Sequence, residues 1–243
     1  MSTFSVLQVS LDQTIGRDSF LEAAAGSGTV TKADLAQLYR ELYGIVVSKI
    51  PEADARVLKA QLDGRGFPVE IVADEELPPL PDEFQVQRVD VADGWLRFTD
   101  SMGRVTSRAV EDLVFLAGGL IQRTRAKSER IMNASLRRED PDTRMERVYK
   151  EEIEKEFRFE FFFWSDPHRL KLALGATNAI FVGDRNIQLH KPEVIAGVAA
   201  ELRGLLPVER TSLGIRDPEK LYPSLRAYSE EIRWHFYQLS KNG

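Results

Sequence analysis

The stretch PEADARVLKAQLDGRGFPVEIV, residues Pro51–Val72, decides the fold of the first part of the chain. Apolar residues recur every three or four positions from Ala55 to Leu62, the spacing of a helix that packs one side against a sheet. Two glycines then favour the end of the helix, and the alternation after them is typical of a strand. The stretch therefore predicts a helix over Glu52–Gly64 and a strand over Val69–Val72.

Two further apolar runs upstream predict strands at Phe4–Ser10 and Ile45–Ile50. Helical patterns lie between them, over Ser19–Ala25 and Lys32–Tyr43. The resulting order of strand, helix, helix, strand, helix and strand predicts a small α/β domain over residues 1–75. Domains of this kind serve for docking, and this one carries no visible reaction chemistry.

Three prolines, Pro78, Pro79 and Pro81, follow the first domain. Proline fixes φ and removes an amide donor, so this composition favours an extended segment. We therefore expect a linker over residues 76–84 and a domain boundary there.

Beyond the linker, over residues 85–206, the pattern changes to the alternation of strands and ends in a helix that begins at Pro192. Phenylalanines at every second position from Phe157 to Phe163 predict a stripe that faces the core. Six or seven antiparallel strands closed by one helix predict a β-barrel. The longer expected strands are Gln85–Val91, Trp95–Thr99, Arg104–Val110, Asp112–Ala117, Phe157–Trp164 and Arg169–Leu174; two short strands, Ala179–Val182 and Asn186–Leu189, lead into the helix Pro192–Leu205.

Residues 207–243 form a helical tail in this interpretation. Asp217 and Pro218 favour a first helix, and Pro223 forces a restart near Ser224. The second helix has a broad apolar and aromatic surface, which must cover something. Packing on the body of the protein is the default, and docking on a second copy or on another protein is the alternative. The candidate partner-binding residues here are Trp234, Phe236 and Tyr237.

Composition excludes several classes of site. The chain has 243 residues, no cysteine and a formal charge of −5, with 43% hydrophobic and 29% charged residues. Without cysteine there are no disulfides, thiolate metal sites or cysteine nucleophiles, which is compatible with a reducing cytoplasm. The negative charge argues against nucleic-acid and membrane partners. The first residues do not resemble a signal peptide, and we expect a cytoplasmic protein.

A charged segment, residues 123–155, interrupts the second domain. From Arg123 to Lys150 it holds nine basic and five acidic residues, a net charge of +4 on a chain that is otherwise negative. We expect a solvated loop or helix inserted in the barrel; a basic arm for an acidic partner is the alternative. The candidate partner-binding residues on it are Arg123, Arg125, Lys127 and Arg130.

No motif for catalysis, cofactor binding or metal ligation stands out. The three histidines, His168, His190 and His235, lie far apart in sequence without a second ligand at helical spacing. The glycines near Gly28 lack the lysine of a phosphate-binding loop, and no serine-hydrolase elbow is present. We therefore assign no catalytic, cofactor or metal residue and expect that the protein is not an enzyme.

The runs FSVLQVS, SFLEAAAGSGTVTKADLAQL and PEADARVLKAQLDGRGFPVEIV resemble the C-terminal domain of the bacterial ribosomal stalk protein, whose fold the ClpS adaptor shares. In that family the second helix offers basic residues to translation GTPases. The matching stretch here, Lys32–Leu35, contains the acidic Asp34, and the only matched lysines, Lys32 and Lys59, are expected to be solvated. The resemblance therefore implies the fold and not GTPase docking.

The piece GWLRFTDSMGRVTSRAVEDLVFLAGG, Gly94–Gly119, resembles bacterial members of the pleckstrin-homology-like superfamily. Together the two halves resemble a group of bacterial proteins of uncharacterised activity that join a stalk-like domain to such a barrel. The resemblance implies an α+β architecture of two domains.

These observations lead to two hypotheses about function. The first is a non-enzymatic protein–protein interaction or adaptor module, acting on a protein partner or by self-association. The alternative is a small-molecule-binding regulatory protein or hydrolase with a site in the cleft between the domains. An adaptor should expose a large apolar or charged patch, whereas the alternative needs an enclosed pocket with convergent polar groups.

Overall fold

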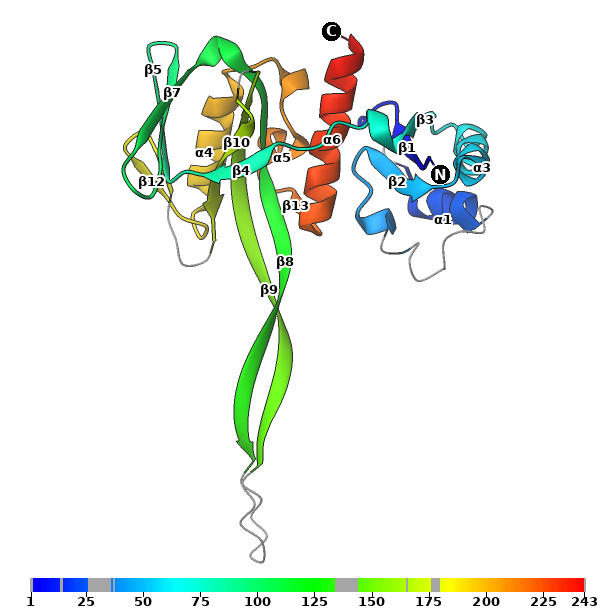
Figure 1. The fold of residues 1–243 in the computed structure, drawn as a ribbon, viewed down its shortest axis with the longest axis horizontal. Coiled ribbons are helices and arrows are strands. Elements are labelled where there is room, and N and C mark those ends of the chain that lie inside the picture. The colour runs from blue at the N-terminus through cyan, green and yellow to red at the C-terminus, as the bar shows by residue number, and fades with distance from the viewer. Residues whose placement is uncertain are drawn as a thin grey trace, which may run out of the picture.

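The computed structural model shows an α+β protein in which two sheet-based units lie on either side of the C-terminal helix (Figure 1). It describes residues 2–13, 15–25, 36, 38–133, 144–164, 166–175 and 180–242, and for 124–133 and 144–152 the backbone alone. Among the helices it describes, none is long and apolar enough to span a membrane.

The N-terminal domain is a three-stranded antiparallel sheet in which β1 (Phe4–Gln8) lies between β2 (Ile45–Ile50) and β3 (Val69–Ala73). Two helices, α1 (Arg17–Ala25) and α3 (Glu52–Asp63), pack on one face of the sheet. These five elements confirm the sequence prediction to within two residues at each end.

Alternation along β1 explains why both faces of this sheet are covered. Val6 belongs to the core under α1 and α3, whereas Leu7 belongs to a second cluster on the opposite face. The expected helix over Lys32–Tyr43, with Lys32 and Asp34, lies mostly outside the described residues; residues 38–40 are helical. Lys59 pairs with Asp63 in the last turn of α3, at 2.9 Å.

The linker is shorter than predicted. A 3₁₀ turn over Asp74–Glu76 leads into the prolines, and β4 (Asp82–Gln85) then pairs in parallel with β10 (His168–Leu174). The prediction that residues 76–84 are all linker is therefore wrong for its last three residues. The segment becomes a strand once the prolines end, because its amides can then pair with the edge of a sheet.

Two five-stranded sheets make up the second domain, in the orders β13-β8-β9-β10-β4 and β12-β11-β5-β6-β7. The predicted phenylalanine stripe on β9 is confirmed as core, and Phe98 meets Phe161 edge to face at 5.0 Å between ring centres. Helix α4 (Pro192–Arg203) packs on the same core, as predicted. The remaining strands are β5 (Arg88–Ala92), β6 (Trp95–Thr99), β7 (Val105–Ala109), β8 (Leu113–Asn133), β9 (Arg144–Phe163), β11 (Ile180–Val182) and β12 (Arg185–Ile187).

The prediction that the strands of this domain are all antiparallel is wrong, because β10 with β4, β11 with β5 and β13 with β8 are parallel pairs. Residues 82–92 form hydrogen bonds with strands of both sheets. Val86 donates to Lys171 of β10 at 2.9 Å, and the carbonyl of the next residue, Gln87, accepts from Phe181 of β11 at 2.9 Å. The chain thus crosses from one sheet to the other and pairs with strands that run in its own direction.

The charged segment is not the inserted loop or helix that we expected. Strands β8 and β9 are 21 and 20 residues long, and they extend beyond the body as a two-stranded antiparallel ribbon (Figure 1). Its register makes Arg123 the partner of Glu154 and Arg125 the partner of Glu152. Opposite charges on facing residues of two strands favour their pairing. Because these positions are charged, the sequence here lacks the apolar alternation from which a strand is predicted.

The C-terminal tail contains a short helix α5 (Leu213–Arg216), strand β13 (Leu221–Tyr222) and helix α6 (Leu225–Asn242). The prediction of a helix that begins at Asp217 is wrong, because Asp217 ends α5 and the chain then adds β13 to the edge of β8. The predicted restart is confirmed: the hydroxyl of Ser224 accepts a hydrogen bond from the amide of Ala227 at 3.1 Å.

Glycines allow α5 to lie directly on β8. A Cβ atom on Gly214 would lie 2.2 Å from the carbonyl oxygen of Gly118. No flexible side chain could move aside, because the blocking atom belongs to the backbone. The contact therefore requires glycine at position 214.

We expect Gly214→Ala to lower the free energy of unfolding by about 2–4 kcal/mol, since α5 must separate from β8. The matched control is Gly197→Ala, inside α4 with open space around its Cβ position. That change should stabilise the protein by about 0.5–1 kcal/mol. Urea denaturation of both variants measures the difference, and equal effects would contradict the proposed close contact.

Candidate functional site

Helix α6 lies between the two domains and contacts both of them (Figure 1). One side packs Tyr228 and Ile232 on the outer face of the sheet that contains β8 and β9. The other side places Trp234 in a cluster with Leu7 of β1 and other residues of the N-terminal domain. We call this region the joint.

Trp234 is the central contact of the joint and is only 7% exposed. Its Nε1 donates to the carbonyl oxygen of Gln8 at 2.6 Å. Gly44, at a φ of 82°, lies against the indole, and a Cβ atom there would come within 2.5 Å of it. The N-terminal domain is therefore shaped to receive this side chain.

Polar contacts continue the joint toward the end of α6 and along the linker. Lys241 pairs with Glu70 of β3 at 2.7 Å, and Arg233 donates to the carbonyl oxygen of Pro78 at 3.3 Å. The helix thus holds the N-terminal domain and the linker together.

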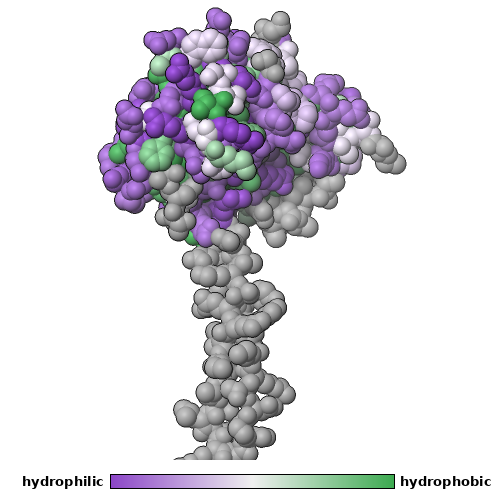
Figure 2. All heavy atoms as spheres, turned by 60° about the vertical axis from the view of Figure 1, so that its left-hand side comes forward, coloured by the Kyte–Doolittle hydropathy of each residue, from purple (hydrophilic) through white to green (hydrophobic). Residues whose placement is uncertain are grey.

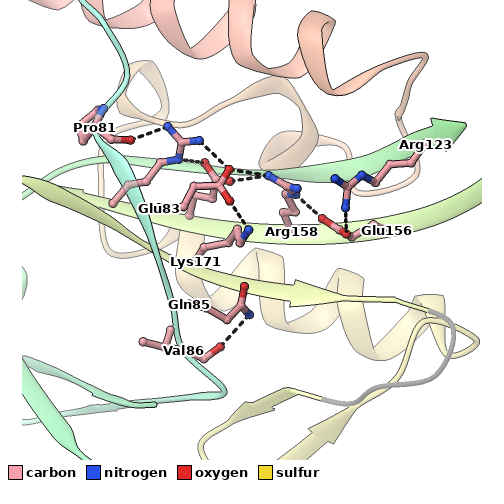
Figure 3. Close-up of polar contacts among 10 residues, drawn as sticks. Pro81, Glu83, Gln85, Val86, Arg123, Glu156, Arg158 and Lys171 are labelled. Carbon is pink, nitrogen blue, oxygen red and sulfur yellow. Dashed lines mark hydrogen bonds and ion pairs between the residues drawn. The ribbon is translucent and has the colours of Figure 1, made fainter. Parts of the chain in front are cut away.

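A cluster of charged side chains lies where β4, β9 and β10 meet (Figure 3). Glu83 of β4 is bound by Arg169 at 2.7 Å and by Arg158 at 3.1 Å, and Lys171 also contacts it. Glu160 is fully buried and pairs with Arg158 at 3.2 Å and with Arg169 at 3.1 Å. We call these five residues the charge network.

The network shifts the pKa values of its carboxyl groups in opposite directions. Burial alone would raise the pKa of Glu83, but hydrogen bonds from Lys171 and Arg169 and the charge of Arg158 lower it to about 2. Burial raises the pKa of Glu160, although Arg169 and Arg158 act against the shift. Glu156 also contacts Arg158, so the three cations face three carboxylates, and the network binds β4 to the sheet.

A second buried cluster orients α5. Glu231 of α6 accepts the amide of Leu213 at 2.6 Å and the hydroxyl of Tyr222 at 2.5 Å. His235 lies one turn further on, with Nε2 3.5 Å from the same carboxylate, and stacks against Phe115 with ring centres 4.9 Å apart. These contacts join α5, β13 and α6 into one packed unit.

Two cavities open at the joint. The first, of about 270 Å³, lies between residues 39–43 of the N-terminal domain and the segment that contains Leu213 and Lys220. The second, of about 220 Å³, is lined by Asp12 of the N-terminal domain and by Arg216 and His235 of the C-terminal segment. Both are small, and Leu11 contributes to each.

The ribbon carries the first set of predicted partner-binding residues. Arg123 is exposed and pairs with Glu156 at 2.9 Å. Arg125, Lys127 and Arg130 are on β8, and the register sets them opposite Glu152, Lys150 and Arg147. Their side chains lie outside the described part of the structure. Only their positions along the ribbon are therefore given.

The second predicted set lies in the joint. Trp234 is buried against the N-terminal domain, Phe236 packs between Phe115 and Phe162, and Tyr237 is partly buried beside Trp234. The default interpretation, packing of this helix on the protein itself, therefore accounts for Trp234 and Phe236. The structure does not bring this set together with the ribbon set.

The second domain carries no broad apolar patch on the face that Figure 2 shows: hydrophilic residues cover most of it, and hydrophobic ones lie singly among them. Trp95 and Met102 of this domain are exposed, at 47% and 78%. Single exposed apolar residues are ordinary for a globular surface. This face offers no hydrophobic docking site.

The described residues contain no group of three or more side chains that could hold a metal ion. Two of the three histidines, His168 and His190, are exposed, and His235 is buried in α6. The structure thus places the three histidines in separate environments.

No protein-family model matches the chain, and neither a curated protein nor a solved structure matches it.

Sequence reasoning missed the charge network. Arg158 and Glu160 alternate with the phenylalanines of β9, a pattern that normally places charges in solvent. They are buried here, at 2% and 0% exposure, because other elements cover this face of the sheet. The only signal was the aromatic surface of the last helix, which had to cover something.

We expect Trp234→Ala to loosen the joint and lower the free energy of unfolding by about 3–5 kcal/mol, since it leaves a cavity and removes the donor to Gln8. Trp95→Ala, at an exposed position of β6, is the matched control and should cost under about 1 kcal/mol. Thermal unfolding and limited proteolysis of the linker provide the measurements. Equal stability and equal cleavage in the two variants would show that the indole does not hold the domains together.

The pH dependence of the free energy of unfolding of a Glu83→Gln variant tests the charge network. A carboxylate with a pKa lowered from 4.5 to about 2 stabilises the folded state above pH 4.5, and this contribution is lost as the pH falls toward 2. The variant should therefore be less stable than the parent by about 2–3 kcal/mol at pH 7, allowing for partial exposure, and by under about 1 kcal/mol near pH 2.5, where most of the contribution is lost.

The control for this experiment is Glu193→Gln, at an exposed position in the first turn of α4. Chemical denaturation at several pH values gives the difference between each variant and the parent. A Glu83→Gln deficit that stayed constant from pH 7 to pH 2.5 would contradict the assigned pKa shift.

Proposed function

We propose that the protein is a non-enzymatic protein–protein interaction or adaptor module, and that the β8–β9 ribbon is its contacting element. The observation that carries the proposal is the ribbon itself. In the described residues, β8 beyond Ile121 and β9 before Phe157 pair only with each other. Both outer edges of the ribbon therefore leave backbone groups free for a partner strand.

Charge along the ribbon supports the same proposal. On the stretch of β8 next to the body, Arg123 and Arg125 lie opposite Glu154 and Glu152 of β9, and Lys127 lies opposite Lys150. Charged residues on exposed edges discourage nonspecific strand pairing, so a partner must match this pattern. An extended acidic segment fits the β8 edge best.

We also propose that each of the two domains is related in fold to a known family. The order and pairing of β1, α1, β2, α3 and β3 support a scaffold like that of the stalk-protein and ClpS domains. The meanders β5–β7 and β8–β10 with α4 support a pleckstrin-homology-like barrel, with the parallel pairs as a departure. The cysteine-free composition supports a cytoplasmic location.

The test begins with a ribbonless variant. Gln122 and Lys155 are cross-strand partners, so residues 123–154 can be replaced by Asn-Gly, which favours a two-residue hairpin turn. The body should keep its thermal unfolding temperature to within about 3 °C, because its core clusters contain no residue of the deleted part. Affinity capture from a bacterial host with mass spectrometry should return a stoichiometric protein with the full chain and not with the variant.

Site-specific photo-cross-linking locates the contact. A benzophenone side chain at Ile153, which is 62% exposed on β9, should cross-link to the captured protein. The same group at Met102, 78% exposed on the barrel, is the control and should not. Capture of the same protein by the ribbonless variant, or cross-links from Met102 alone, would overturn the role of the ribbon.

The second candidate function is a small-molecule-binding regulatory protein or hydrolase, and the cavities at the joint favour it. Thermal-shift measurements against a metabolite panel distinguish it from the adaptor. If no stoichiometric partner is captured and a metabolite stabilises the chain, the adaptor proposal fails and this one stands.

A further inference from the structure

The larger cavity at the joint, of about 270 Å³, is built from two parts of the chain that only the fold brings together. Leu11, Leu42 and Leu213 supply apolar wall, and Tyr39 and Tyr43 supply aromatic rings. The volume is enough for one small ring with a substituent, since cavities of roughly 150 Å³ already admit benzene.

Two cations, Arg40 and Lys220, complete the lining. The Nζ atom of Lys220 lies 5.2 Å from the centre of the Tyr43 ring. Neither cation takes part in an ion pair within the part of the chain that the structure describes, whereas Arg158, Arg169 and Lys171 all contact carboxylates. Two cations beside an apolar cavity are arranged to receive an acid group.

We propose that this cavity binds a small organic anion with an aromatic body. The ring would lie between the leucines and Tyr39, and the acid group would meet Arg40 and Lys220 at the rim. Leu213 and Lys220 belong to the C-terminal segment, and the other named residues belong to the N-terminal domain. Binding therefore stabilises the docked arrangement of the two units, independently of the ribbon.

The full chain is titrated with three probes: phenyl phosphate, which has both the ring and the acid; inorganic phosphate, which lacks the ring; and benzyl alcohol, which lacks the charge. Phenyl phosphate should bind with a Kd of about 0.1–1 mM, the range for a ligand of this size. At about 10 mM it should raise the unfolding temperature by about 3–6 °C. The other two probes should bind at least about tenfold more weakly.

Variants assign the binding to this cavity. Arg40→Gln and Lys220→Gln are at partly or fully exposed positions and should each weaken phenyl phosphate binding by about five- to tenfold without loss of fold. Lys191→Gln, an exposed cation at the start of α4, is the matched control and should bind as the parent does. Isothermal titration calorimetry measures the affinities.

The proposal is overturned if phenyl phosphate fails to saturate the chain by about 10 mM. It is also overturned if the double variant of Arg40 and Lys220 binds as tightly as the parent. The ribbonless variant should keep full affinity, since no residue of the ribbon lines the cavity. Failure of this binding site and failure of the ribbon proposal are thus separate outcomes.

Discussion

The rest of the structure depends on the packing of helix α6, which is buried on one side against the second domain and on the other side against the N-terminal domain. An amphipathic helix normally has one apolar stripe and one solvated side, but α6 carries a second buried surface centred on Trp234. Its first side covers the sheet that contains β8 and β9, and its second side receives the N-terminal domain. The prolines of the linker therefore do not separate two independent domains, because the last helix joins them again.

This arrangement explains the charged residues buried on β9. Arg158 and Glu160 face away from the phenylalanine core, toward elements that the C-terminal segment and β4 bring to the outer face of the sheet. Burying single charges there would cost several kcal/mol, and the ion pairs of the network offset this cost because each cation contacts a carboxylate. The same pairs bind Glu83, so the strand that leaves the linker is held in place by electrostatics as well as by backbone hydrogen bonds.

The ribbon and the joint suggest two separable activities on one scaffold. The ribbon extends a hydrogen-bonding edge away from the body, which suits recognition of an extended segment of another protein. The cavity at the joint lies where the N-terminal domain meets α5 and β13, and a ligand there would contact both.

Local patterning determined the five elements of the N-terminal domain, the core stripe of β9, helix α4 and the start of α6, because periodicity and capping depend on neighbouring residues alone. Tertiary structure decided what the patterns left open. The long strands of the ribbon could not be predicted because charged residues, such as Arg123 opposite Glu154, stand where apolar alternation would mark a strand. The cavity between Arg40 and Lys220 and the second side of α6 depend on segments over a hundred residues apart, and the partner that β4 brings to Arg158, Glu83, lies 75 residues away. Contacts at that separation are specified by the packing of the whole chain, and no local pattern contains them.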